Sequence, residues 1–171
     1  ILLIPALRLP VAAEYDALGD QAMASATLAR GPQDNQTYGL RASLLAKAED
    51  NKSLGLLYDE LRKDASNPDP ERRLLLGQIA QFLKRPQEAL EWYRGVPGGE
   101  QRTEARLRIA NVLFELGNKD EAFAQVQELQ GDASADDDAR RAAYLLEAEL
   151  KQKSEDDAGE LAVLARGLAA Y

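Results

Sequence analysis

The chain has 171 residues, a formal net charge of −8 from 29 acids and 21 bases, and neither cysteine nor histidine. The missing residue types exclude a Ser-His-Asp triad, a thiol nucleophile, a disulfide and the usual zinc and haem sites. The acidic balance argues against binding to nucleic acid or anionic lipid, because both need a basic face. We therefore expect no catalysis, no cofactor and no metal ion.

We expect the chain to be a segment of a longer protein, because it begins with Ile1 and not Met, and the helix-like run that ends at Tyr171 has no stop signal after it. The first four residues are all Ile or Leu and are followed by Pro5 and Pro10. This apolar stretch is far shorter than the roughly 20 residues of a membrane span, and no basic leader precedes it. We expect a broken helix here and no membrane insertion of this segment.

Composition and helix breakers predict an all-α chain. Hydrophobic residues make up 45% of the sequence but aromatic residues only 6%, and alanine and leucine dominate the apolar share. These two residues favour helices, whereas β-branched residues favour strands. Proline, glycine and asparagine or aspartate pairs then divide the chain at helix ends. The predicted helices are 11–18, 21–30, 34–48, 52–65, 70–84, 86–95, 101–117, 119–130, 137–153 and 157–170.

The middle of the chain contains an internal repeat. Residues 76–80 align with 109–113, and residues 87–90 align with 120–123, both at the offset that separates Ala89 from Ala122. Small residues recur in these segments at Gly77 and Ala110, where two helix backbones can approach closely. Repeats of this length are typical of stacked helix pairs.

These residues resemble the tetratricopeptide repeat (TPR) family. The matching pattern is Leu76-Gly77 in a first helix, followed by Ala89 and Tyr93 in a second. Arg73 and Arg106 stand where the family often has tryptophan. The resemblance implies a right-handed α-solenoid of about five helix pairs, with one superhelical segment over 1–171. Its clearest repeats are 70–99 and 102–131, with weaker repeats at 34–66 and 137–171 and a degenerate one at 1–31.

The resemblance also implies a partner-binding groove lined by the first helix of each pair. The groove set consists of apolar, amide and acidic side chains: Glu71, Leu74, Gln78, Gln81, Phe82, Glu104, Leu107, Asn111, Phe114 and Glu115. For each residue the alternative is ordinary packing or solvated surface. One TPR subclass grips a terminal carboxylate with lysines, and those positions are Leu74 and Leu107 here, so that clamp is not expected.

The function implied by the resemblance is a non-catalytic scaffold or adaptor that binds another protein or peptide. The composition is similar to that of bacterial TPR lipoproteins anchored in the outer membrane of pseudomonads. One of these is the adaptor of a periplasmic carboxyl-terminal processing protease that degrades cell-wall hydrolases. That similarity implies a periplasmic location, with the cytoplasm as the alternative. The other reading is a structural spacer or dimerisation segment that associates with itself, while an α/α enzyme is disfavoured.

Overall fold

The computed structural model describes residues 5–63 and 69–171, and within these ranges every regular element is helical. Two compact units divide at the Arg85–Pro86 bond. The first unit contains a short 3-10 helix, η1 (Pro5–Leu7), and α1 (Arg8–Ala17), α2 (Gln21–Leu28), α3 (Asn35–Lys47), α4 (Asn51–Lys63) and α5 (Pro70–Phe82). The second contains α6 (Pro86–Arg94), α7 (Glu100–Glu115), α8 (Lys119–Gln130), α9 (Asp137–Lys153) and α10 (Asp157–Ala170).

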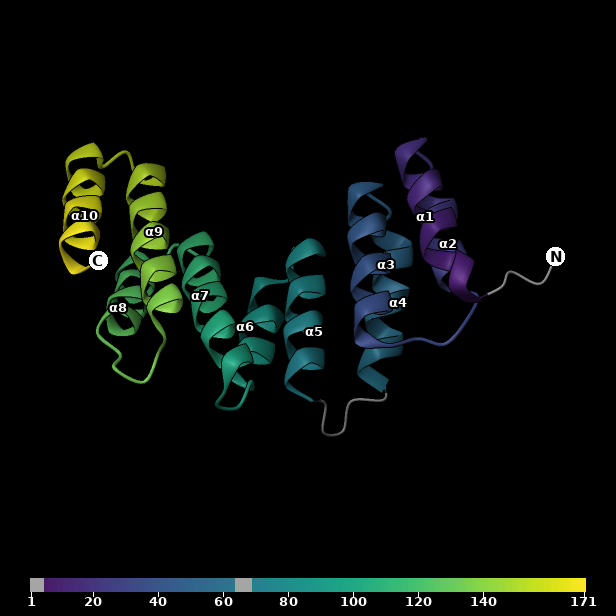
Figure 1. Ribbon diagram of the computed structural model, residues 1–171, viewed down its shortest axis with the longest axis horizontal. Coiled ribbons are helices and arrows are strands. Elements are labelled where there is room, and N and C mark those ends of the chain that lie inside the picture. The colour runs from purple at the N-terminus through teal and green to yellow at the C-terminus, as the bar shows by residue number, and fades with distance from the viewer. Residues whose placement is uncertain (1–4, 64–68) are drawn as a thin grey trace. The chain divides into compact units, whose positions relative to one another are not determined.

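Helices adjacent in sequence pack side by side within each unit (Figure 1). In the first unit α2 lies against α1 and α3, and α5 lies against both α3 and α4. In the second unit α7 contacts α6, α8 and α9, while α9 contacts α8 and α10. None of the described helices is long and apolar enough to cross a membrane.

The predicted helices are confirmed, with small differences at their ends. The bounds of α8, α9 and α10 are those predicted from the sequence. The first helix begins at Arg8 rather than at residue 11, because Pro10 occupies the first turn, where a backbone N–H has no acceptor within the helix. The end predicted for the fourth helix, 64–65, lies outside the described residues.

Five turns share one backbone geometry, and each joins the two helices of a predicted pair. Each turn has a residue with positive φ, whose N–H bonds three residues back while the next N–H bonds five residues back, as in a Schellman motif. In the α7–α8 turn, Gly117 donates to Phe114 O and Asn118 donates to Leu113 O, at 3.0 and 2.9 Å. The positive-φ residues of the five turns are Gly19, Glu49, Lys84, Gly117 and Glu155.

In three of these turns the residue after the positive-φ position also caps the next helix. The carboxylate of Asp20 accepts from Met23 N at 3.0 Å, and that of Asp156 accepts from Gly159 N at 2.9 Å. Asp50 accepts from Ser53 N in the same way. One aspartate therefore ends one helix and begins the next, which keeps the turn short and fixes how the two helices face each other.

Alanines are fully buried on the packed helices of the second unit. Ala110 on α7 and Ala122 on α8 are fully buried, and these two helices pack closely. Ala89 and Ala105, on the adjacent pair α6 and α7, are also fully buried. Because an alanine side chain is a single methyl group, the helix axes can approach until the larger leucine and valine side chains fill the remaining space.

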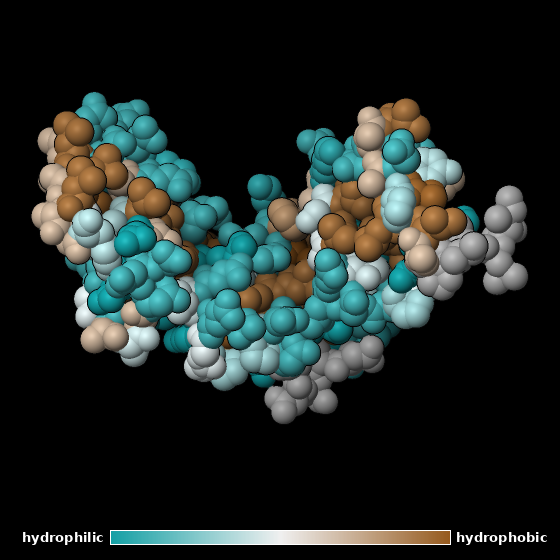
Figure 2. All heavy atoms as spheres, in the orientation of Figure 1, coloured by the Kyte–Doolittle hydropathy of each residue, from teal (hydrophilic) through white to brown (hydrophobic). Residues whose placement is uncertain are grey.

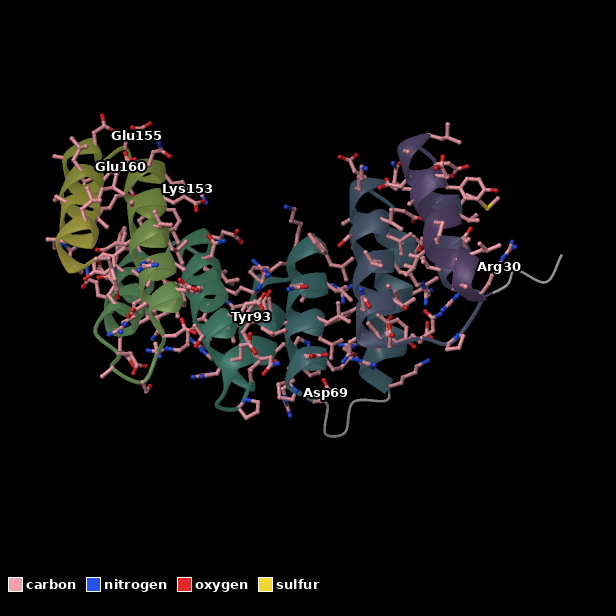
Figure 3. The ribbon with its side chains drawn as sticks, viewed as in Figure 1. Arg30, Asp69, Tyr93, Lys153, Glu155 and Glu160 are labelled. Carbon is pink, nitrogen blue, oxygen red and sulfur yellow. The ribbon has the colours of Figure 1, made fainter. Side chains whose placement is uncertain are left out.

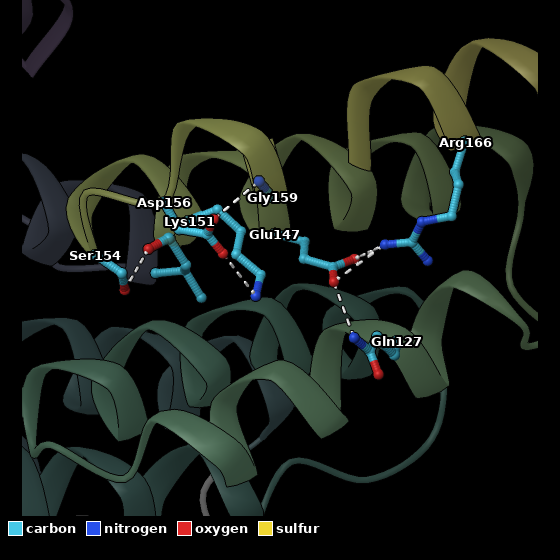
Figure 4. Close-up of polar contacts among 8 residues, drawn as sticks. Gln127, Glu147, Lys151, Ser154, Asp156, Gly159 and Arg166 are labelled. Atoms are coloured by element: carbon cyan, nitrogen blue, oxygen red, sulfur yellow. Dashed lines mark hydrogen bonds and ion pairs between the residues drawn. The ribbon is translucent and has the colours of Figure 1, made fainter. Parts of the chain in front are cut away.

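A buried carboxylate ties together the last three helices. Glu147 on α9 is 1% exposed. Its two oxygens accept hydrogen bonds from Gln127 Nε2 at 2.9 Å and Gln130 Nε2 at 2.6 Å, both on α8. Arg166 Nη2, on α10, lies 3.2 Å from both oxygens (Figure 4). The charge is thus compensated from both neighbouring helices, which a buried carboxylate requires.

We expect Gly117→Ala to lower the free energy of unfolding by about 1 kcal/mol, because φ is +84° there and an L side chain disfavours that conformation. No heavy atom lies within 4 Å of the added Cβ, so the loss comes from the backbone and not from a clash. Gly98→Ala is the control, since its Cβ also enters open space and φ lies outside the left-handed region. Urea unfolding measures both variants, and equal losses would contradict the argument.

Glu147→Ala should destabilise the chain by about 2 kcal/mol, because it removes the shared acceptor of three side chains and leaves a void. The control is Glu149→Ala on the same helix, whose exposed carboxylate pairs with Lys153 Nζ at 2.7 Å. Exposed pairs of this kind contribute little, so its loss should stay within about 0.5 kcal/mol. Similar losses in the two variants, measured by thermal unfolding, would show that Glu147 is not a structural link.

Candidate partner-binding face

One side of α7 carries the five residues predicted for the second unit. Spacings of three and four residues place Glu104, Leu107, Asn111 and Phe114 along the same side of the helix. Glu104 and Glu115 are exposed, while the other three are half-buried. The opposite side of α7 holds the buried Ile109 and Val112. The sequence pattern therefore separates a core side from a side that is partly open.

A hollow of about 890 Å³ lies at the beginning of this side, between the first turns of α7 and the loop that leads into α9. Of the predicted residues, Glu104 and Leu107 line this hollow together, whereas Asn111, Phe114 and Glu115 do not. The hollow is completed by polar and small residues that were not predicted as site residues: Gly98, Gly99, Glu100, Arg102, Thr103, Arg106, Asp132, Ser134, Ala135, Asp136 and Ala139.

An ion pair between α7 and the loop forms one wall of the hollow. The Arg106 side chain is 14% exposed and donates from Nη1 to Asp132 Oδ2 at 2.5 Å. Asp132 Oδ1 also accepts from the backbone N and the Oγ of Ser134, at 2.9 and 2.6 Å. These hydrogen bonds, that of Ser134 first and that of Arg106 next, hold the pKa of Asp132 well below its ordinary value. The carboxylate therefore stays ionised and the loop stays attached to α7.

The loop ends at a helix cap. Asp136 caps α9, and its Oδ1 accepts from Ala139 N at 2.7 Å. Among residues 5–63 and 69–171, no group of three or more histidines, cysteines or acids is placed to hold a metal ion. The sequence analysis did not predict the contact between Arg106 and Asp132. The one available signal was their separation of 26 residues, which spans the α7–α8 helix pair.

Glu104 is held in place by the helix on which it stands. Its Oε1 accepts from Arg108 Nε and Nη2 at 2.9 and 2.7 Å, one helical turn later. The Arg108 guanidinium also interacts with the buried phenol of Tyr93, which is labelled in Figure 3. Burial raises the pKa of the Tyr93 hydroxyl, and the positive charge of Arg108 opposes that rise. The side chain at the rim of the hollow is thus linked to the interior of the unit.

Asn111 and Phe114 have different surroundings from Glu104 and Leu107, which line the hollow. Asn111 Oδ1 is buried and accepts no hydrogen bond within the described part of the chain. The Phe114 ring packs edge-on against Phe123 of α8, with centroids 6.2 Å apart, and Lys119 Nζ lies 5.3 Å from its centroid. Phe114 thus contacts α8 through both Phe123 and Lys119.

The five predicted residues of the first unit lie on α5 and do not all reach the surface. Leu74 is 6% exposed, so its side chain belongs to the interior and does not offer groove surface, which corrects that expectation. Phe82 is 43% exposed, and Gln78 and Gln81 are half-buried. Glu71 is exposed, and its Oε2 accepts from Asn35 Nδ2 of α3 at 3.4 Å.

A second, apolar hollow of about 380 Å³ lies between α9 and α10. Its walls include Tyr144, Leu145 and Leu168, with Arg141 at its edge. Leu161 and Leu168 are 68% and 82% exposed, and Figure 2 shows apolar side chains in brown over α10. This surface differs in kind from the hollow at α7, because it offers almost no polar group.

The fold is similar to that of a solved structure. The crystal structure of YrrB is described as that of a TPR protein with an unusual peptide-binding site. It matches this chain with a TM-score of 0.54 and 20% sequence identity, over 95% of this chain and 84% of that one. The likeness shows that the chain has the TPR-like α-solenoid fold that its repeats predict. No protein-family model and no curated protein matches the chain.

The lowered pKa of Asp132 predicts a specific dependence of stability on pH. Below the ordinary aspartate pKa of 3.8, Asp132 becomes protonated in the unfolded chain, whereas in the folded chain it is still ionised. The stabilisation by Asp132 is therefore complete above that value and is lost as the pH falls through the lowered pKa of the folded state.

Asp132→Asn should thus be less stable than the parent near neutral pH, with a difference that narrows in acid. Urea unfolding over a pH series measures this, and Glu91→Gln, at an exposed position of α6, is the control. A difference between Asp132→Asn and the parent that stays constant with pH would contradict the ionised pair.

Proposed function

We propose that the chain is a non-catalytic scaffold that binds a peptide or a segment of another protein in the hollow between α7 and the loop before α9. The observation that carries this proposal is the hollow of about 890 Å³. The predicted groove residues Glu104 and Leu107 both line it. That volume suits a few side chains of an extended segment. Thr103 and Ser134 add hydroxyl groups that can bond to a peptide backbone.

One further observation supports a peptide as the ligand. The similar structure of YrrB is described as having a peptide-binding site, and the present chain shares its fold.

A finer form of the proposal concerns the partner and the compartment. Here the chain belongs to an adaptor in the bacterial periplasm, anchored at the outer membrane through another part of the protein. Its partner would be a carboxyl-terminal processing protease or a cell-wall hydrolase that the protease degrades. This form is supported by the similarity of composition to adaptor lipoproteins of this kind, and the cytoplasm remains the alternative compartment.

A selection from a library of random linear peptides tests the binding function. Enriched peptides are labelled, and their affinities are measured by fluorescence anisotropy for the parent chain and for Leu107→Gln. We expect the variant to bind about tenfold more weakly, because it replaces an apolar contact in the hollow by a polar group. Leu161→Gln is the matched control, since it makes the same change at an exposed site on α10.

The proposal fails if no peptide is enriched, or if enriched peptides bind the parent and Leu107→Gln equally well. Circular dichroism of both variants verifies that helicity is unchanged. Sedimentation of the same samples distinguishes the alternative function, a spacer or dimerisation segment, which is favoured by the exposed Leu161 and Leu168. In that case the parent would dimerise with increasing concentration while no selected peptide depended on Leu107.

A further inference from the structure

The net charge of the chain lies entirely in its second unit. Of 21 bases and 29 acids, residues 1–85 contain 11 of each and are neutral, while residues 86–171 contain 10 bases and 18 acids. The difference of −8 equals the formal charge of the whole chain. The unit that contains the hollow therefore has an excess of carboxylates.

The basic side chains of this unit are already engaged within it. Eight of the ten form ion pairs with acids of the same unit: Arg94, Arg106, Arg108, Arg140, Arg141, Lys151, Lys153 and Arg166. Arg102 donates to the carbonyl oxygens of Arg94 and Val96 at 3.4 and 3.3 Å. Lys119 lies over the ring of Phe114. The surplus that remains to interact with a ligand is thus negative.

In the lining of the hollow, too, the basic groups are already bonded and the carboxylates are in excess. Its two guanidinium groups are those of Arg102, bound to backbone carbonyls, and Arg106, bound to Asp132 and Glu128. Four carboxylates line the same space, from Glu100, Glu104, Asp132 and Asp136. Glu100 is exposed and forms no ion pair with any residue from 86 to 171. Each carboxylate can accept more hydrogen bonds than it receives here, whereas the guanidiniums are committed.

We infer that the hollow binds a basic segment, in which lysine or arginine side chains lie between Leu107 and the carboxylates of Glu100 and Glu104. This inference rests on the proposed function and specifies the chemistry of its ligand. The apolar part of a lysine or arginine side chain packs on Leu107 and on the methyl groups of Ala135 and Ala139, which line the same space. The cationic end reaches the carboxylate of Glu100, which is exposed, and that of Glu104, where Arg108 donates to Oε1 alone.

Electrostatics disfavours an acidic segment. Its carboxylates would lie beside four carboxylates and only two guanidiniums, so the net interaction with the lining is repulsive. A neutral segment would gain only the contact with Leu107 and the alanines. The attraction acts near the surface, so it weakens as salt shortens the screening length to about 8 Å at physiological ionic strength.

The test uses the same random peptide library on the whole chain and sequences the enriched pool. Lysine and arginine should be over-represented relative to the input. The double variant Glu100→Gln, Glu104→Gln should bind the enriched basic peptides about fivefold more weakly at low salt, since exposed pairs each contribute modestly. The matched control is Glu91→Gln, Glu149→Gln, which changes the net charge equally at exposed sites that do not line the hollow.

The outcomes separate this inference from the proposed function. If the enriched peptides depend on Leu107 but are neutral or acidic, the inference is wrong and the binding function stands. If basic peptides are enriched but the two double variants weaken them equally, the attraction belongs to the unit as a whole and the inference is again wrong. If no enriched peptide depends on Leu107, the proposed function itself fails.

Discussion

Every helix of this chain depends on its neighbours to bury its apolar side. An amphipathic helix of 8 to 17 residues is marginal alone, because the entropy lost on ordering it exceeds what its own hydrogen bonds return. Packing on adjacent helices supplies the difference, and close packing requires small residues where the helices meet. Ala89, Ala105, Ala110 and Ala122 provide them in the second unit, all fully buried. Repetition of this arrangement makes the fold a solenoid.

Local sequence was sufficient to predict the helices because their ends have local causes. Asp69 before Pro70 and Asp156 before Asp157 show the cap chemistry in the sequence itself, and α5 and α10 begin where these residues predict. Three of the five turns use Glu49, Lys84 or Glu155 at positive φ. Their side chains give no sign of that conformation, so the common turn geometry became visible only in the structure.

The candidate site was less predictable, since it depends on contacts between distant positions. The family pattern placed Glu104 and Leu107 on an open side of α7, and both line the hollow. The same pattern placed Leu74 in the groove, although it is buried. Helical spacing gives the side of a helix on which a residue lies, but the neighbours decide whether that side is covered. Nor could spacing show that Arg106 holds the loop at Asp132 and so gives the hollow its far wall.

The network around Glu147 has a mechanical consequence. Two glutamines of α8 and one arginine of α10 meet a single carboxylate of α9. If α9 slid along its neighbours by one residue, about 1.5 Å, the charge would leave its donors and remain buried without compensation. Gradual sliding is therefore resisted, whereas separation of a whole helix exposes the carboxylate to water.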